Sequence, residues 1–123
     1  MSLRIYNPSE LNALKADYAN FATVAAVSNV YTLNLLNNRN FAIETTDTNA
    51  KTITFSNVAS TSNTIIQVSV KLKYTNAAAI TYPTGTTWKD GAIPVLTAGK
   101  QYILLFTSYD NGTSWLTSAV GAW

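Results

Sequence analysis

Two residue types are missing from this chain of 123 residues, which contains no cysteine and no histidine. Without cysteine the chain has neither a disulfide framework nor a thiolate metal site, so it can fold in a reducing cytoplasm. Without histidine, serine hydrolase chemistry lacks its usual general base. The sequence therefore argues against that class of enzyme and against a fold held together by disulfide bonds.

Charged residues are also scarce, at 11% of the chain against about 25% in typical soluble domains. Eight basic and six acidic residues leave a net charge of +2. The basic residues are scattered and form no stripe of the kind that binds phosphates, so we expect no nucleic-acid partner. Threonine, asparagine and serine fill the polar positions, and such a neutral surface suits hydrogen bonding to other copies or to sugars.

The beginning of the sequence lacks the basic stretch and the long apolar run of a signal peptide. No segment approaches the run of about 18 apolar residues that a membrane-spanning helix requires. We therefore expect neither a leader nor a membrane partner. A length of 123 residues is that of a single domain, large enough to bury its own core.

A short helix is predicted near the N-terminus. Asn7 has the character of an N-cap, Pro8 suits the first helical position, and Glu10 can reach back as in a capping box. The apolar residues that follow lie three or four positions apart, which makes one narrow stripe that must pack on a partner. We place this helix in an N-terminal attachment arm, residues 1–29, whose candidate contact residues are Leu11, Leu14, Tyr18 and Phe21.

From residue 22 onward the apolar period changes to two and turn residues become frequent, which indicates short strands. The clearest strand is 64–74, where apolar and polar side chains alternate, whereas 101–108 has apolar residues on both faces and looks buried on both. Asp110, Asn111 and Gly112 predict a hairpin into a last strand. About seven to nine strands at such spacing are typical of an all-β, antiparallel β-sandwich or jelly-roll-like module, which we assign to residues 30–123.

Six short segments follow one another along the chain in a recognisable order. They are 53–56 (ITFS), 80–83 (ITYP), 88–91 (WKDG), 94–97 (PVLT), 102–106 (YILLF) and 110–115 (DNGTSW). In this order they resemble the C-terminal β modules of tailed-bacteriophage virion proteins, found in tail fibres, baseplate proteins and head fibres. The resemblance implies a non-enzymatic structural protein of the virion, a surface decoration or head-fibre type subunit attached by its N-terminal arm. It also implies a homotrimer, a major capsid or tail protein as partner, and synthesis in the host bacterial cytoplasm.

The acidic residues suggest no catalytic or metal site. A glycosidase needs two carboxylates across one cleft, and no spacing places Asp47 and Asp90 together. The loops 47–49 and 110–112 offer oxygen ligands, but the same residues are the commonest turn formers. We expect no enzyme activity, no metal and no cofactor.

The aromatic residues leave two alternatives open. Trp88 and Trp115 follow tight turns and are expected to close the ends of the core, whereas Trp123 suits either a contact with a neighbouring subunit or packing within its own chain. Stacking faces for sugars are also available, so the second hypothesis is a tail-associated receptor-binding module that recognises host cell-wall saccharide. The candidate stacking residues are the tryptophans with Tyr31, Tyr74, Tyr82 and Tyr109.

Overall fold

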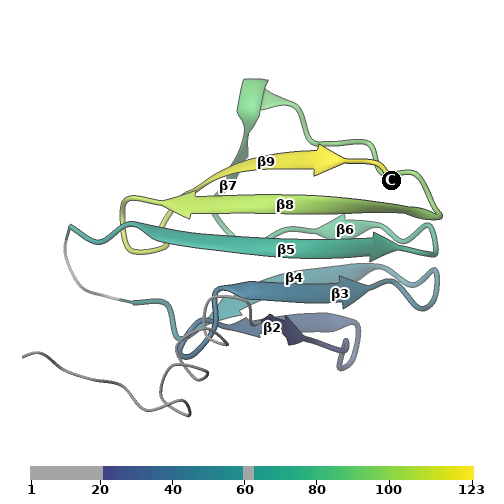
Figure 1. The fold of residues 1–123 in the computed structure, drawn as a ribbon, viewed down its shortest axis with the longest axis horizontal. Coiled ribbons are helices and arrows are strands. Elements are labelled where there is room, and N and C mark those ends of the chain that lie inside the picture. Colours follow the sequence, from purple (N-terminus) through teal and green to yellow (C-terminus); the bar gives the residue numbers. More distant parts are fainter. Residues whose placement is uncertain (1–20, 60–62) are drawn as a thin grey trace, which may run out of the picture.

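Strands make up nearly all the regular structure of the computed structural model, which describes residues 21–59 and 63–123 (Figure 1). The all-β class is therefore confirmed, while the helix expected before residue 21 lies outside the described residues. Within the described residues one 3-10 turn, η1 (Lys89–Gly91), follows β7. The strands are β1 (Ala22–Thr23), β2 (Val30–Asn34), β3 (Asn40–Glu44), β4 (Lys51–Ser56), β5 (Ile66–Tyr74), β6 (Ile80–Thr81), β7 (Thr86–Trp88), β8 (Lys100–Ser108) and β9 (Trp115–Gly121).

These strands form a six-stranded sheet with the order β1-β3-β5-β8-β9-β7 and a three-stranded sheet with the order β2-β4-β6. From β1 to β6 the chain visits the two sheets alternately. Two crossings return it to the same sheet in the same direction, so each new strand lies parallel to the last strand in that sheet. Segments far apart in sequence therefore lie side by side, as β3 and β5 do (Figure 1).

The predicted antiparallel arrangement is wrong for most of the molecule. Only the β5–β8 and β8–β9 pairs are antiparallel, while the other pairs between named strands are parallel. The reason is that the early turns carry the chain from one sheet to the other, whereas a hairpin would keep it in the same sheet. The hairpin predicted around residues 110–112 is confirmed, because it joins β8 to β9.

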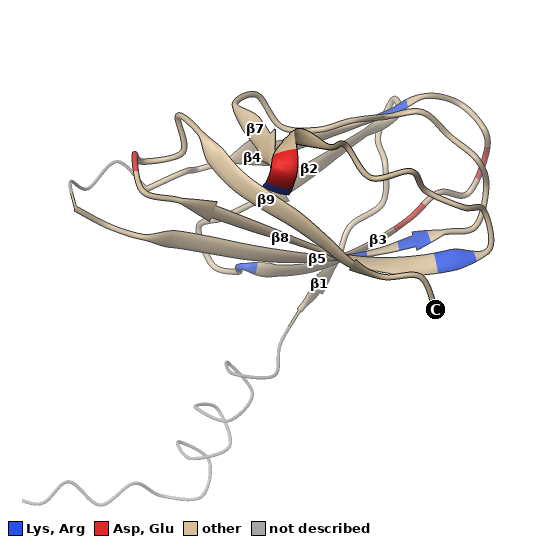
Figure 2. Ribbon diagram, turned by 90° about the horizontal axis from the view of Figure 1, so that it is seen from above, with Lys and Arg blue, Asp and Glu red and all other residues tan. Residues whose placement is uncertain are grey.

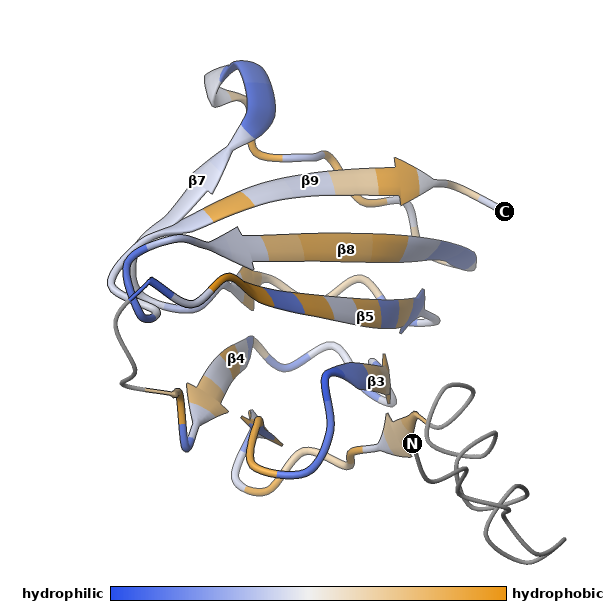
Figure 3. Cartoon of the chain, turned by 60° about the vertical axis from the view of Figure 1, so that its left-hand side comes forward, coloured by the Kyte–Doolittle hydropathy of each residue, from blue (hydrophilic) through white to orange (hydrophobic). Residues whose placement is uncertain are grey.

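One hydrophobic core lies between the two sheets. Alternate residues of β5 are buried, and their bands along the strand are visible in Figure 3. Each large apolar side chain that is fully buried contributes about 1.5–3 kcal/mol relative to an exposed one. The buried apolar residues of β5 are Ile66, Val68, Val70, Leu72 and Tyr74, and those of the small sheet include Tyr31, Leu33 and Ile53.

The tryptophans that follow turns close the core, as expected. Trp115 is buried, and its ring lies 4.6 Å from that of Phe55, measured between centroids. Trp88 is half-buried and meets Tyr82 edge to face at a centroid distance of 4.7 Å. Such aromatic pairs stabilise a fold beyond the area they bury.

The turn at Gly85 joins the β7 region to the β8–β9 hairpin. The carbonyl oxygen of Gly85 accepts a hydrogen bond of 2.9 Å from the main-chain N–H of Trp115. Gly85 has a φ of +84°, and a Cβ atom added there would lie 2.1 Å from the carbonyl oxygen of Thr113. Both the backbone angle and the close approach therefore require glycine.

We predict that Gly85→Ala lowers the free energy of unfolding by more than about 3 kcal/mol, because the left-handed angle and the clash both oppose it. Gly99→Ala is the matched control, since Gly99 has a φ of +85° but open space around it. The control should lose only about 1–2 kcal/mol. Urea unfolding of both variants measures the difference, and equal losses would contradict the close approach at Gly85.

Candidate functional site

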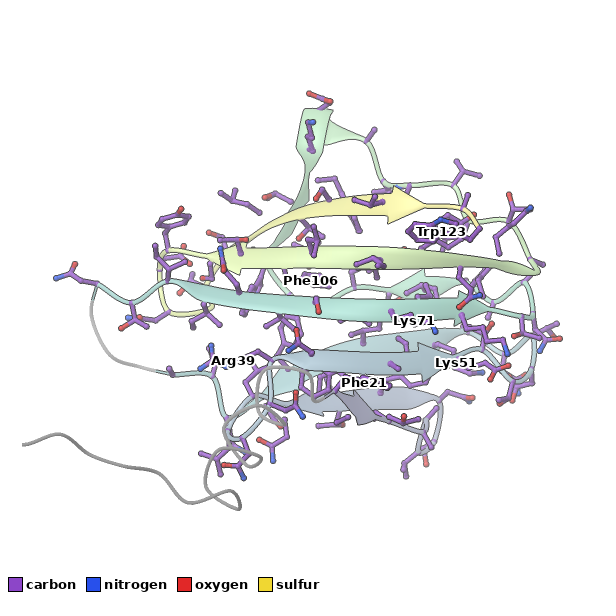
Figure 4. All side chains as sticks on the ribbon, in the orientation of Figure 1. Phe21, Arg39, Lys51, Lys71, Phe106 and Trp123 are labelled. Atoms are coloured by element: carbon purple, nitrogen blue, oxygen red, sulfur yellow. The ribbon has the colours of Figure 1, made fainter. Side chains whose placement is uncertain are left out.

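The sequence-predicted contact residues are not brought together in the described structure. Leu11, Leu14 and Tyr18 lie outside the described residues. Phe21 and Trp123 are each 61% exposed, but Phe21 precedes β1 at one edge of the large sheet, whereas Trp123 follows β9 (Figure 4). The role of these residues as attachment contacts therefore remains a prediction.

Part of the expected arm belongs structurally with the β strands. Ala22 and Thr23 form β1 and pair with Phe41 and Ala42 of β3. Ala22, Val24 and Ala26 pack against the core. The segment between residues 22 and 29 thus forms one wall of a surface site.

This site is a groove of about 500 Å³ between the segment that joins β1 to β2 and the ends of β3 and β5. Parallel strands end at the same edge of a sheet. Charged residues from β3, from β5 and from the loop between β3 and β4 therefore meet at this groove. Figure 2 shows several of the coloured segments gathered at the end of the molecule where β3 and β5 finish. The charged residues that line the groove are Glu44, Asp47, Lys51, Lys71 and Lys73.

Lys51 is 2% exposed and holds the base of the groove together. Its Nζ donates to Asn29 Oδ1 at 3.2 Å, to the carbonyl oxygen of Asn49 at 2.8 Å, and to Asp47 Oδ1. An ammonium group has three protons to donate, and these three acceptors use them all. Lys51 therefore clamps the 47–51 loop to the start of β2 and offers no free proton to a substrate.

Two neighbouring residues of the groove wall have left-handed backbone angles. The φ of Ser28 is 51° and that of Asn29 is 65°, which costs about 1–2 kcal/mol for a residue with a side chain. The conformation is held by two main-chain hydrogen bonds between Val27 and Val30 and by the bond from Lys51 to Asn29. The wall is therefore fixed in shape before any ligand binds.

Two carboxylates stabilise turns by accepting hydrogen bonds from residues of the same turn. Hydrogen bonds from Lys51 and Asn49 hold the pKa of Asp47 below its usual range, and hydrogen bonds from Ser114 and Ser108 do the same for Asp110. Their roles match the turn chemistry that the sequence predicted. Within residues 21–59 and 63–123 no three potential metal ligands of the acidic, histidine or cysteine type gather at one place.

The outer face of the large sheet carries a second feature, which we call the outer apolar patch. It consists of Ile103 and Leu105 on β8 with Leu116 and Val120 on β9. Leu105, Leu116 and Val120 are 41%, 59% and 49% exposed, although 101–108 was predicted to be buried on both faces. That prediction is wrong because no described segment covers this side of β8.

Most aromatic residues proposed for sugar stacking are used inside the fold. Tyr31 and Tyr74 are buried, and the hydroxyl of Tyr31 donates to the carbonyl oxygen of Glu44 at 2.6 Å. Burial raises the pKa of Tyr82 to about 12. Among the candidates, Tyr109 and Trp123 present large exposed fractions.

The groove was hard to predict from the sequence, because its residues come from four separate segments. The single available signal was Lys51, a lysine at an inward position of the alternating segment 51–55. A buried lysine needs several acceptors around it. Its loop partners Asp47 and Asn49 were predicted only as turn residues.

We predict that Lys51→Met destabilises the fold by about 2–4 kcal/mol, because it leaves Asn29, Asp47 and Asn49 without their shared donor. Lys100→Met is the matched control, since Lys100 is an exposed strand lysine and its replacement should change stability by less than about 0.5 kcal/mol. Thermal or urea unfolding measures both. An unchanged Lys51→Met variant would show that the clamp does not stabilise the fold.

Acid should weaken the fold through Asp47 and Asp110. Because their folded pKa values are lowered, ionised carboxylates favour the folded state above about pH 4, the usual unfolded range. This stability is lost as the pH falls through the folded pKa values. Urea midpoints between about pH 5 and pH 2 should therefore fall less steeply in the Asp47→Asn/Asp110→Asn variant than in Asp90→Asn, and equal slopes would contradict this assignment.

None of the described helices is long and apolar enough to cross a membrane. Comparison with known proteins found no family model that matches the chain, no similar curated protein and no similar solved structure.

Proposed function

We propose that the chain is a non-enzymatic structural protein of a tailed-phage virion, a surface decoration or head-fibre type subunit attached by its N-terminal arm. Its module is a sandwich of one mixed and one parallel sheet around one core, and the many parallel pairs fit this arrangement better than a jelly roll of antiparallel strands. The virion assignment itself comes from the resemblance of residues 53–115.

The observation that carries a structural role is the outer apolar patch. Three leucine and valine side chains of the patch are substantially exposed on two paired strands. Val120 pairs with Ile103, and Leu105 lies diagonal to both Leu116 and Val120. A contiguous apolar surface of this kind marks a contact with another protein more often than scattered exposed residues do. Ser118, opposite Leu105, and Thr107, opposite Leu116, lie within the patch and add no charge, which suits contacts between copies.

The use of polar groups within the fold supports a non-enzymatic role. The three protons of Lys51 are taken by acceptors of the chain, and Asp47 and Asp110 close turns. A general base needs a free lone pair near a substrate. Lys51 has no lone pair while it is charged and donating all three protons, and the hydrogen bonds of Asp47 and Asp110 serve their own turns.

Immunolabelled virions seen by negative-stain microscopy test the location. Label should decorate the particle at regular positions on the head or the tail, with the major capsid or tail protein as the contacting partner. Particles from a virus that lacks this chain are the control. If label is absent from every wild-type particle, the proposed function is wrong.

We predict that the full chain is a homotrimer in solution. The double variant Leu116→Ser/Val120→Ser should raise the dissociation constant of the trimer at least about tenfold, because it removes apolar contacts between subunits. Val95→Ser is the matched control, since Val95 is 91% exposed on a loop away from the patch. Analytical ultracentrifugation measures both variants. A trimer unaffected by the patch substitutions would place the subunit contact elsewhere.

A second candidate function is recognition of host cell-wall saccharide by a tail-associated module. It is favoured by Trp123, whose exposed ring stands beside Lys71 and Gln101. Exposed aromatic rings with polar neighbours are a common way to hold sugars. A glycan array probed with the full chain tests this function, and the absence of binding to every saccharide would count against it.

A further inference from the structure

The described residues that line the groove carry one more positive charge than negative charges. Lys51 pairs with Asp47, and Lys73 lies 3.9 Å from Glu44, measured from Nζ to Oε2. Three lysines and two carboxylates line the groove, so one charge remains. The remaining cation is Lys71, for which the described residues supply no ion pair.

Lys71 lies between the groove and a second hollow. Lys71 is on β5, and its side chain is on the outer face of the large sheet. It pairs with Ala42 of β3 on one side and with Ile103 of β8 on the other. It lines the groove on one side and a hollow of about 290 Å³ on the other. In the view of Figure 4, Lys71 of the large sheet has Trp123 on one side and Lys51 of the small sheet on the other. The two hollows therefore share one exposed ammonium group.

Trp123 forms the far side of the second hollow and is held in a fixed position. Its main-chain N–H donates to the carbonyl oxygen of Gln101 at 3.3 Å, and the N–H of Gln101 donates back at 3.1 Å. Its ring lies over Gly121, where a Cβ atom would come within 2.1 Å of Cζ3. Glycine thus lets the ring lie against the backbone while 61% of the residue stays exposed.

We propose that Lys71, Trp123 and the groove together bind an acidic sugar residue of a polysaccharide. The aromatic ring supplies a flat apolar face for the C–H groups of a sugar ring. Lys71 pairs with the carboxylate, and the hydroxyl groups of Thr23, Ser28 and Thr46 in the groove hydrogen-bond the neighbouring sugar. This inference rests on the second candidate function and names its ligand class.

The size and the charge both favour this ligand. The combined hollows fall within the range of about 300–1,000 Å³ that is usual for ligand sites. A neutral sugar would leave Lys71 without a counter-charge. The carboxylate of an acidic sugar supplies that charge, because the described residues give Lys71 no ion pair.

Titration of the full chain with oligogalacturonate tests the proposal, with neutral malto-oligosaccharide as the comparison probe. Calorimetry should show oligogalacturonate binding at least about tenfold tighter than the neutral probe. Intrinsic fluorescence should change as well, because Trp123 is exposed while Trp115 is buried. The Lys71→Gln and Trp123→Leu variants should each lose about tenfold in affinity, whereas Lys89→Gln, which removes an exposed charge from η1, should bind as the wild type does.

Three outcomes would overturn the proposal. They are no binding of oligogalacturonate at millimolar concentration, equal binding of the acidic and neutral probes, and equal affinity of Lys71→Gln and Lys89→Gln. A Trp123→Leu variant that dissociates an oligomer, with fluorescence unchanged by the saccharide, would assign Trp123 to a subunit contact instead. Neutral-sugar binding would preserve the second candidate function, and virion labelling tests the first one independently.

Discussion

The burial of one face of β5 is the constraint on which the rest of the structure depends. This strand is central in the large sheet, between β3 and β8, and its inward side chains meet those of the small sheet in one core. The parallel half of the fold is built onto one edge of β5 and the antiparallel hairpin onto the other. Its alternation of buried and exposed residues therefore divides the molecule into a core and an outer face.

The surface features follow from that division. Alternate crossing between the sheets makes β1, β3 and β5 parallel, so their carboxyl ends and the loops that follow meet at one end of the molecule. The groove with its buried Lys51 lies there. The hairpin of β8 and β9 lies on the other side of β5. Only its inner face packs against the core, so the apolar residues on its outer face are exposed.

The two halves of the fold differ in how much the sequence predicted. The strand 64–74 and the hairpin at 110–112 were correct, because alternation and turn residues within a short window determine them. The parallel pairing of β2 with β4 was not predictable in this way, since those partners are some twenty residues apart and their turn signals resemble those of hairpins. The double apolar face of 101–108 was misread because a strand with one exposed apolar face has the same local pattern as a strand buried on both faces.

The same limit applies to the candidate site. Trp123 was noticed as an unusual aromatic residue, yet its neighbours Lys71 and Gln101 become visible only when β5, β8 and the residues after β9 are placed side by side. Lys71 looks like any outward lysine of an amphipathic strand. Its significance depends on the pairing of Lys51 and Lys73 with carboxylates from other segments, which no local pattern contains.

We propose that this protein works through the outer face of its large sheet. Hydroxyl-radical footprinting of the free chain and of the assembled particle tests it most directly, because the method reports side-chain exposure residue by residue. Leu105, Leu116 and Val120 should lose reactivity on assembly, while Val95, which is 91% exposed in the free chain, should keep it. Equal reactivity of the outer apolar patch in both states would contradict the account.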